Sequence, residues 1–245
     1  MALQPRLCYN CGNAMNRPGT EPLETSQTRE HIPAQNLFVG YPDEYKLNRI
    51  TVPGCQRCNR EYSTIDDEMR DAIGVMNERD PLREEITARA VRNMTGRDNF
   101  RERVVMTEDQ RLAFIFNYAP FLRYNIKNFK GIFYHKCRFP FSETAYGVRS
   151  LFANGGDQQD QGHMQRFGNQ LYTLITQNAL WEHSGHPNIF QYIIKGVQID
   201  RNNNCTFTDN IAGSPFIMCV CKYHNQIEMI TIAFNRANFN VPEGF

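Results

Sequence analysis

Apolar and polar residues follow two different spacings over the first third of the chain. Residues 23–32 are polar and rich in threonine, and predict a strand that Pro33 ends because proline has no backbone N–H. Residues 49–52, Arg-Ile-Thr-Val, are mostly β-branched and predict a second short strand. Over residues 59–76 the apolar positions recur every three or four residues, as on one face of a helix: Ile65, Met69, Ala72, Ile73 and Met76. The pattern predicts strand, loop, strand and helix in that order.

The rest of the chain predicts helices followed by an antiparallel sheet. Helical spacing covers residues 81–94, 120–134 and 166–180. Three strand-like runs close the chain, at residues 190–199, 216–223 and 227–234, with a hairpin expected between the last two. We therefore expect an α+β protein in two parts. Residues 1–78 form the ββα unit, and residues 79–245 form a helical linker and a C-terminal α+β domain that binds substrate or a partner.

Composition narrows the class of protein. A chain of 245 residues, 41% hydrophobic and 22% charged, can bury a core as one or two ordinary globular domains. No apolar run approaches the roughly 20 residues of a membrane span, and residues 1–9 lack the apolar stretch of a signal peptide. We expect a cytoplasmic protein, whose cysteines are thiols or metal ligands rather than disulfides. The net charge of +1 indicates no partner, because nucleic acid responds to local charge.

The cysteines divide into two groups. Two Cys-x-x-Cys pairs occur at Cys8/Cys11 and Cys55/Cys58, and a two-residue gap lets both sulfurs of a tight turn face one metal. Two pairs supply the four thiolates that suit tetrahedral Zn²⁺, so we predict a structural zinc site; four unligated cysteines are hard to reconcile with the repeated spacing. The other group is expected to be buried thiols: Cys137, Cys205, Cys219 and Cys221. For Cys219 and Cys221 the alternative is a second metal site, with His224 just beyond them.

An acid–histidine pair, Glu30-His31, lies between the cysteine pairs, and Asn59 directly follows the second pair. This arrangement resembles the HNH, or ββα-metal, endonucleases. The Glu-His-Ile-Pro sequence of residues 30–33 and the Cys-Asn-x-x-x-Ser-x-x-Asp-Asp sequence of residues 58–67 resemble a bacterial and phage subgroup with an added C-terminal domain. The resemblance implies a zinc-stapled ββα-metal nuclease module followed by a helical segment and an antiparallel-sheet domain.

The resemblance also implies roles for these residues. His31 would be the general base, since histidine titrates near neutral pH and can take a proton from water. Glu30 and Asn59 would hold a catalytic divalent metal. Two protein oxygens plus water and phosphate suit Mg²⁺, and the sequence does not separate Mg²⁺ from Mn²⁺.

The sequence departs from the family pattern at two positions. Glu30 stands where many members have aspartate, so its reach toward a metal is longer by one methylene. The position of the central asparagine, about five residues before the third cysteine, is Ile50. Asn48 is the nearest asparagine but is displaced by two residues, so the residue that orients the base is either unassigned or Asn48.

Basic residues near the motif and in a later helix are candidates for nucleic-acid binding. Alternatively, they are surface charges on solvated faces. They are Arg29, Arg57 and Arg60 around the motif, and Arg123, Lys127 and Lys130 at helical spacing within residues 120–134. Asp66, Asp67 and Glu68 are better explained as acidic residues near a helix start than as metal ligands.

We interpret the chain as a metal-dependent endonuclease that hydrolyses DNA phosphodiester bonds, with RNA as a further possible substrate. The resemblance suggests a role in antiviral defence, restriction or a mobile element. Two alternatives remain: a nuclease subunit gated by a partner complex, and a zinc-dependent nucleic-acid-binding protein without catalysis. The C-terminal domain is expected to bind a protein partner or a second copy of the chain.

Overall fold

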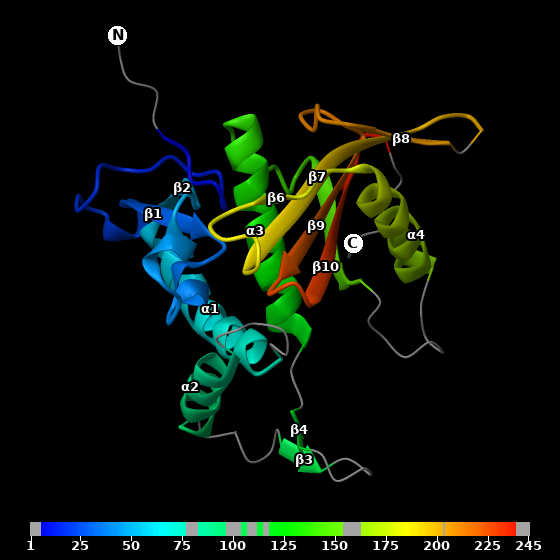
Figure 1. Ribbon diagram of the computed structural model, residues 1–245. Coiled ribbons are helices and arrows are strands. Elements are labelled where there is room, and N and C mark those ends of the chain that lie inside the picture. The colour runs from blue at the N-terminus through cyan, green and yellow to red at the C-terminus, as the bar shows by residue number, and fades with distance from the viewer. Residues whose placement is uncertain are drawn as a thin grey trace.

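The computed structural model describes residues 6–76, 83–96, 104–106, 112–114, 118–153, 163–202 and 204–238. These residues form an α+β protein with four α-helices, a short hairpin near the N-terminus and a larger antiparallel sheet built from the C-terminal half (Figure 1). Among the described helices, none combines the length and apolarity needed to cross a membrane.

Strand, strand and helix follow one another in the N-terminal unit, in the predicted order. Strand β1 (Gln27–Ile32) pairs antiparallel with β2 (Ile50–Cys55), and helix α1 (Gln56–Met76) starts where β2 ends. The connections contain short 3₁₀ helices, η1 (Leu23–Thr25), η2 (Gln35–Phe38) and η3 (Asp43–Lys46). The second strand is longer than predicted and runs through Pro53 into the third cysteine, so the cysteine marks the junction of strand and helix.

The C-terminal sheet has the strand order β5-β10-β9-β7-β6, with β8 also paired to β7. The predicted strands at residues 190–199 and 216–223 are confirmed as β7 (Phe190–Ile199) and β9 (Phe216–Tyr223), and the third is β10 (Ile227–Asn235). The prediction missed three strands of this sheet, which are β5 (Tyr146–Phe152), β6 (Glu182–His183) and β8 (Cys205–Thr208).

Alternate residues of the sheet pack against helices on opposite faces. In β9, Met218 and Val220 face helix α4 (His163–Asn178) and join a core with Leu171 and Ile175 of that helix. Cys219 and Cys221 lie in the other core, which contains helix α3 (Tyr118–Cys137). Strands that are covered on both faces are rich in apolar residues along their whole length, and this is why β9 could be recognised in the sequence.

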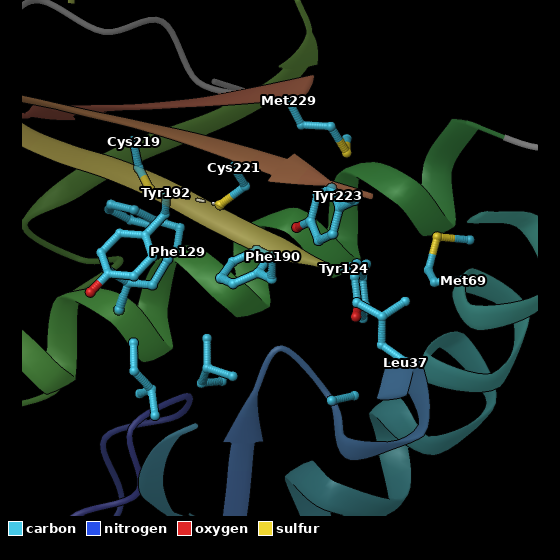
Figure 2. Packing of buried hydrophobic residues seen from close by; sticks show 14 of the residues in the cluster. Leu37, Met69, Tyr124, Phe129, Phe190, Tyr192, Cys219, Cys221, Tyr223 and Met229 are labelled. Carbon is cyan, nitrogen blue, oxygen red and sulfur yellow. Dashed lines mark hydrogen bonds between the residues drawn. The ribbon is translucent and has the colours of Figure 1, made fainter. Parts of the chain in front are cut away.

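Helix α3 lies between the N-terminal unit and the sheet (Figure 1). Its residues belong to one hydrophobic core with residues of η2, α1 and the sheet, and Figure 2 shows this shared core: Leu37, Met69, Tyr124, Phe129, Phe190, Tyr192 and Tyr223. The helix approaches β1 closely at Gly131, where an added Cβ would overlap the Ile32 side chain. The predicted domain boundary near residue 78 lies outside the described residues, and the elements on its two sides share this core.

Buried polar side chains also hold α3 on the sheet. Asn125 donates hydrogen bonds of 2.8 Å to the hydroxyls of Ser150 and Thr231, and Asn128 donates one of 2.9 Å to the hydroxyl of Tyr223. The Tyr223 hydroxyl in turn donates to the side-chain carbonyl of Asn125 at 2.9 Å. This buried network favours one orientation of the helix, although the side-chain carbonyl of Asn128 is buried without a hydrogen-bond partner among the described residues.

The remaining elements lie at the edges of these layers. Helix α2 (Arg83–Thr95) packs on α1, and β3 (Val104–Met106) pairs with β4 (Leu112–Phe114) in a separate two-stranded sheet. Ser184, from the loop between β6 and β7, bridges the two strands of the β1–β2 hairpin at the end where the connecting loop leaves β1 and enters β2. The Ile50 N–H donates to the Ser184 hydroxyl at 2.8 Å, and this hydroxyl donates to the Ile32 carbonyl.

Candidate metal centre and histidine site

The first cysteine pair lies on a tight turn that is hydrogen-bonded to β2. Gly12 donates its N–H to the Cys8 carbonyl at 2.9 Å and has φ 72°, a conformation that favours glycine. The Tyr9 N–H donates to a carbonyl of β2 at 2.9 Å. In the second pair, Cys55 ends β2 and Cys58 lies in the first turn of α1. The two turns therefore meet at the junction of strand and helix.

The four sulfurs converge to the spacing of a metal site. The ligand atoms of Cys8, Cys11, Cys55 and Cys58 all lie within 4.8 Å of one another, and the sulfurs of Cys11 and Cys55 are 3.9 Å apart. A tetrahedral zinc with bonds of about 2.3 Å would separate its sulfurs by about 3.8 Å. Over the described part of the chain, no other group of three or more His, Cys, Asp or Glu side chains is this close. The cluster can hold a metal ion and fits the predicted zinc.

A hydrogen bond within the cluster stabilises negative charge on the sulfur of Cys8. The pKa of Cys8 is lowered to about 4, chiefly because the Cys58 thiol hydrogen-bonds to its sulfur. The same interaction holds the pKa of Cys58 above its usual range. Arg57 is exposed, and its interaction with the Cys11 sulfur raises the pKa of the Arg57 guanidinium group. Sequence analysis left Arg57 as either a nucleic-acid contact or a surface charge, and its interaction with the cysteine cluster was not foreseen.

His31 lies half-buried on β1, directly opposite Thr51 of β2. Its Nδ1 atom is 3.4 Å from the Thr51 hydroxyl oxygen. Burial lowers the pKa of His31 below its usual value, and the positive charges of Arg49 and Arg29 lower it further. The imidazole is therefore neutral at neutral pH, which is the form that can accept a proton.

Glu30 points to the opposite face of the strand and into the protein, because neighbouring strand residues alternate in direction. Its side chain is 9% exposed, and a carboxylate oxygen lies 3.6 Å from Nζ of Lys127 on α3. The same ammonium group donates to both carboxylate oxygens of Asp66 on α1, at 2.9 and 2.6 Å. We call these three residues the carboxylate–lysine cluster.

An aromatic ring lies beside the lysine of this cluster, and burial affects the ionisation of its carboxyl groups. Nζ of Lys127 lies 5.3 Å from the centre of the Tyr62 ring. Burial raises the pKa values of Glu30 and Asp66 even though the Lys127 charge opposes the shift. Burial, followed by the charges of both carboxylates, raises the pKa of Tyr9 well above its usual value. The cluster is therefore a desolvated site in which negative charge is only partly balanced.

The predicted catalytic metal ligands do not converge in this arrangement. Asn59 is half-buried near the start of α1, and within the described residues no hydrogen bond joins it to Glu30 or His31. The Glu30 carboxylate faces the ammonium group of Lys127 instead. A divalent cation on that carboxylate would lie against a buried positive charge, so Glu30 and Asn59 do not fit a Mg²⁺ or Mn²⁺ ion here.

The expected basic stripe of α3 is corrected by the structure. Lys127 and Lys130 are buried, and Lys130 pairs with Glu143 at 3.0 Å, so neither presents its charge to solvent. Arg123 is 52% exposed but forms a 2.8 Å ion pair with Glu61. Because these partners come from other elements, the helix alone did not reveal that its lysines point inward. Around the motif, Arg29 and Arg60 are exposed.

The side chain beside His31 is that of Thr51, which sequence analysis did not assign. Asn48, the nearest asparagine to the family position, is exposed and has φ 56° just before β2. The contact between His31 and Thr51 depends on the register of the two strands, which places these residues directly opposite each other. Sequence analysis also gave Asp66 no role in a buried cluster. Its position between Tyr62 and Met69, on the buried face of α1, is the pattern that could have indicated a buried carboxylate.

The second group of cysteines forms no metal cluster among the described residues. Cys219 and Cys221 are buried with sulfurs 3.9 Å apart, as the buried-thiol prediction expects, while His224 accepts or donates a 3.0 Å hydrogen bond with Tyr41. The pKa of Cys137 is raised to about 11 by burial.

Comparison of the chain with protein-family models, curated proteins and solved structures found no match.

Proposed function

We propose that this protein is a zinc-stapled ββα endonuclease that hydrolyses phosphodiester bonds of DNA, with His31 as the general base. The observation that carries the proposal is the placement of a half-buried, neutral histidine on the first strand of a hairpin whose second strand and following helix are joined by the four-cysteine cluster. Zinc would hold this junction rigid and take no part in the chemistry, because four thiolates leave no open coordination position.

The histidine contact suggests how the base is oriented. When Nδ1 carries the ring hydrogen and donates a hydrogen bond to the Thr51 hydroxyl, the lone pair of Nε2 is free to accept a proton. In the proposed reaction Nε2 takes a proton from water, the water oxygen bonds to phosphorus, and the bond from phosphorus to the 3′ oxygen breaks. The departing oxygen is protonated from solvent.

Positive charge beside His31 would bind the phosphate. Arg29 is exposed on the same strand face as His31, two residues away, and Arg49 is near enough to lower the pKa of His31. Arg49 is half-buried and donates through Nε to the Lys46 carbonyl at 3.0 Å. A phosphate oxygen is the kind of acceptor that such a guanidinium group binds.

Cleavage of supercoiled plasmid tests this function. Zinc-loaded protein would be assayed with Mg²⁺, with Mn²⁺ and with EDTA, beside His31→Ala. We expect His31→Ala to cleave about 10²–10⁴-fold more slowly than the wild type, because this is the usual contribution of a general base. His135→Ala is a matched control, because His135 is also half-buried with a pKa lowered mainly by burial, but lies on α3.

Two results would contradict the proposal. One is undiminished cleavage by folded His31→Ala. The other is no cleavage of DNA or RNA by the folded, zinc-loaded protein under any metal condition.

A second candidate function is a nuclease subunit that a partner activates. The observation that favours it is the engagement of Glu30 by Lys127, which comes from a helix shared with the C-terminal sheet. Cleavage that appears only when a co-expressed partner is added would support this candidate over the self-sufficient enzyme.

A further inference from the structure

We propose that Lys130 of helix α3 is a positioning residue of the zinc site. It holds the side chain of Asn10 in the orientation in which the Asn10 amide donates to the sulfur of Cys58, and it brings positive charge to the four thiolates. The proposal rests on the zinc ion of the proposed function, for which the cysteine cluster has the spacing. It makes α3 part of the metal centre, although all four cysteines belong to the N-terminal unit.

The contact between Lys130 and Asn10 is the first argument. Nζ of Lys130 lies 3.3 Å from the side-chain carbonyl oxygen of Asn10 and 3.3 Å from its backbone carbonyl oxygen. An ammonium group only donates hydrogen bonds, so the oxygen of the Asn10 amide faces the lysine and the NH₂ group faces away from it. Both residues are buried, so water competes little for this contact.

The second argument is that Asn10 contacts two of the four sulfurs. It lies between the first two cysteines, its backbone N–H donates to the sulfur of Cys8, and its side chain hydrogen-bonds to the sulfur of Cys58. Each bond lowers the pKa of the cysteine that it reaches and so favours the thiolate, which is the form that binds metal. For Cys58 this effect opposes the larger rise in pKa that Cys8 causes. Groups that hydrogen-bond to metal ligands orient those ligands and strengthen metal binding.

Charge is the third argument. One Zn²⁺ ion and four thiolates together carry two negative charges, and most of the cysteines are buried. The side chain of Lys130 is 5% exposed and places its ammonium group against the turn between Cys8 and Cys11. The other partner of Lys130 is Glu143, at 3.0 Å, whose side chain is 58% exposed. Solvent screens that carboxylate, so the lysine still supplies positive charge beside the buried cysteines.

Two variants of neighbouring groups are matched controls. Lys136→Met removes another lysine of α3, whose ion pair is with Glu182 at 2.6 Å. Glu143→Gln removes the ion-pair partner of Lys130 and leaves the contact with Asn10 in place. Together they separate the proposed contact from the loss of any ion pair on this helix.

The test measures the zinc affinity of the full-length protein by competition with a chromophoric chelator. Lys130→Met and Asn10→Ala are each expected to bind zinc about 10–100-fold more weakly than the wild type, and both controls are expected to bind it as the wild type does. Because the lysine acts through Asn10, the double variant should lose less than the product of the two single losses.

The absorption spectrum of the cobalt-substituted protein gives a second reading. The thiolate-to-cobalt charge-transfer band should move to longer wavelength in Lys130→Met, because thiolates with weaker hydrogen bonds and less positive charge nearby release electron density more easily. A lysine that only fills space in the core would leave this band unchanged.

Wild-type zinc affinity in folded Lys130→Met would overturn the proposal, and so would single losses that multiply fully in the double variant. Should Lys130→Met not fold, wild-type affinity in Asn10→Ala would overturn it from the other side of the contact. None of these readings uses cleavage. A protein that shows them but cleaves no nucleic acid refutes the nuclease alone, and plasmid cleavage with unchanged zinc affinity in Lys130→Met refutes this inference alone.

Discussion

Replacing Ser184 with alanine should weaken the hairpin that carries His31, although Ser184 lies more than 150 residues further along the chain. Its fully buried hydroxyl accepts a hydrogen bond from the Ile50 N–H at 2.8 Å and donates one to the Ile32 carbonyl. These two residues are paired with each other at the end of the β1–β2 ladder. The serine therefore couples both strands to the loop before β7.

The cost of the substitution follows from the groups left behind. Ser184→Ala leaves one buried donor and one buried acceptor without a partner, and each such group costs about 1–3 kcal/mol. We expect a loss of about 2–6 kcal/mol in the free energy of unfolding. For a chain of this size that loss corresponds to a fall of roughly 4–24 °C in Tm.

Thermal unfolding of the zinc-loaded protein by circular dichroism is the assay. Ser63→Ala is the matched control, because the Ser63 hydroxyl also donates to a carbonyl, at 2.9 Å, but on the exposed face of α1. The control should change stability by less than about 0.5 kcal/mol. Equal Tm values for Ser184→Ala and Ser63→Ala would refute the reasoning that the buried hydroxyl holds the hairpin.

Three further predictions concern the metal cluster, the packing of α3 and the base. Cys58→Ser should abolish bound zinc, measured by atomic absorption, whereas Cys137→Ser should retain it, because only the first cysteine belongs to the cluster. Gly131→Ala should destabilise the protein by about 0.5–2 kcal/mol in urea unfolding, because overpacking against β1 outweighs the gain in helix propensity. Arg49→Gln should raise the pKa of His31, measured by NMR, because it removes a positive charge that opposes protonation. Since only neutral His31 can act as base, the acidic limb of the cleavage profile should then move to higher pH.

Each of these predictions has a result that would contradict it. Zinc retained by Cys58→Ser would remove that cysteine from the ligand set. A more stable Gly131→Ala protein would mean that Ile32 moves aside at little cost. An unchanged or lowered pKa of His31 in Arg49→Gln would show that the arginine does not act on the histidine electrostatically.

The sequence predicted best those elements whose pattern is local. Strand β9 is buried on both faces and is a nearly continuous apolar run, and β7 is mostly apolar and β-branched or aromatic; both were placed with their observed bounds. Strand β8, Cys-Thr-Phe-Thr, is partly exposed, and β6 has only two residues, so neither has an apolar run to recognise. Paired spacing of the cysteines likewise indicated a metal cluster that the structure brings within bonding range.

The carboxylate–lysine cluster could not be predicted in this way, because it depends on contacts between distant elements. Lys127 and Asp66 are 61 positions apart, and Lys127 follows helical spacing that is equally typical of a solvated face. The contact of Thr51 with His31 required the strand register, which the isolated strands do not specify. Long-range packing and register thus decided the parts of the site that the motif left open.

The most direct test of the central claim is chemical rescue of His31→Ala in the plasmid assay, with and without added imidazole. The account predicts slow cleavage by the zinc-loaded variant and partial recovery of the rate by imidazole. The recovery should increase with pH as free imidazole loses its proton, since the neutral form replaces the missing base. Cleavage by folded His31→Ala at the wild-type rate, with no response to imidazole, would contradict it.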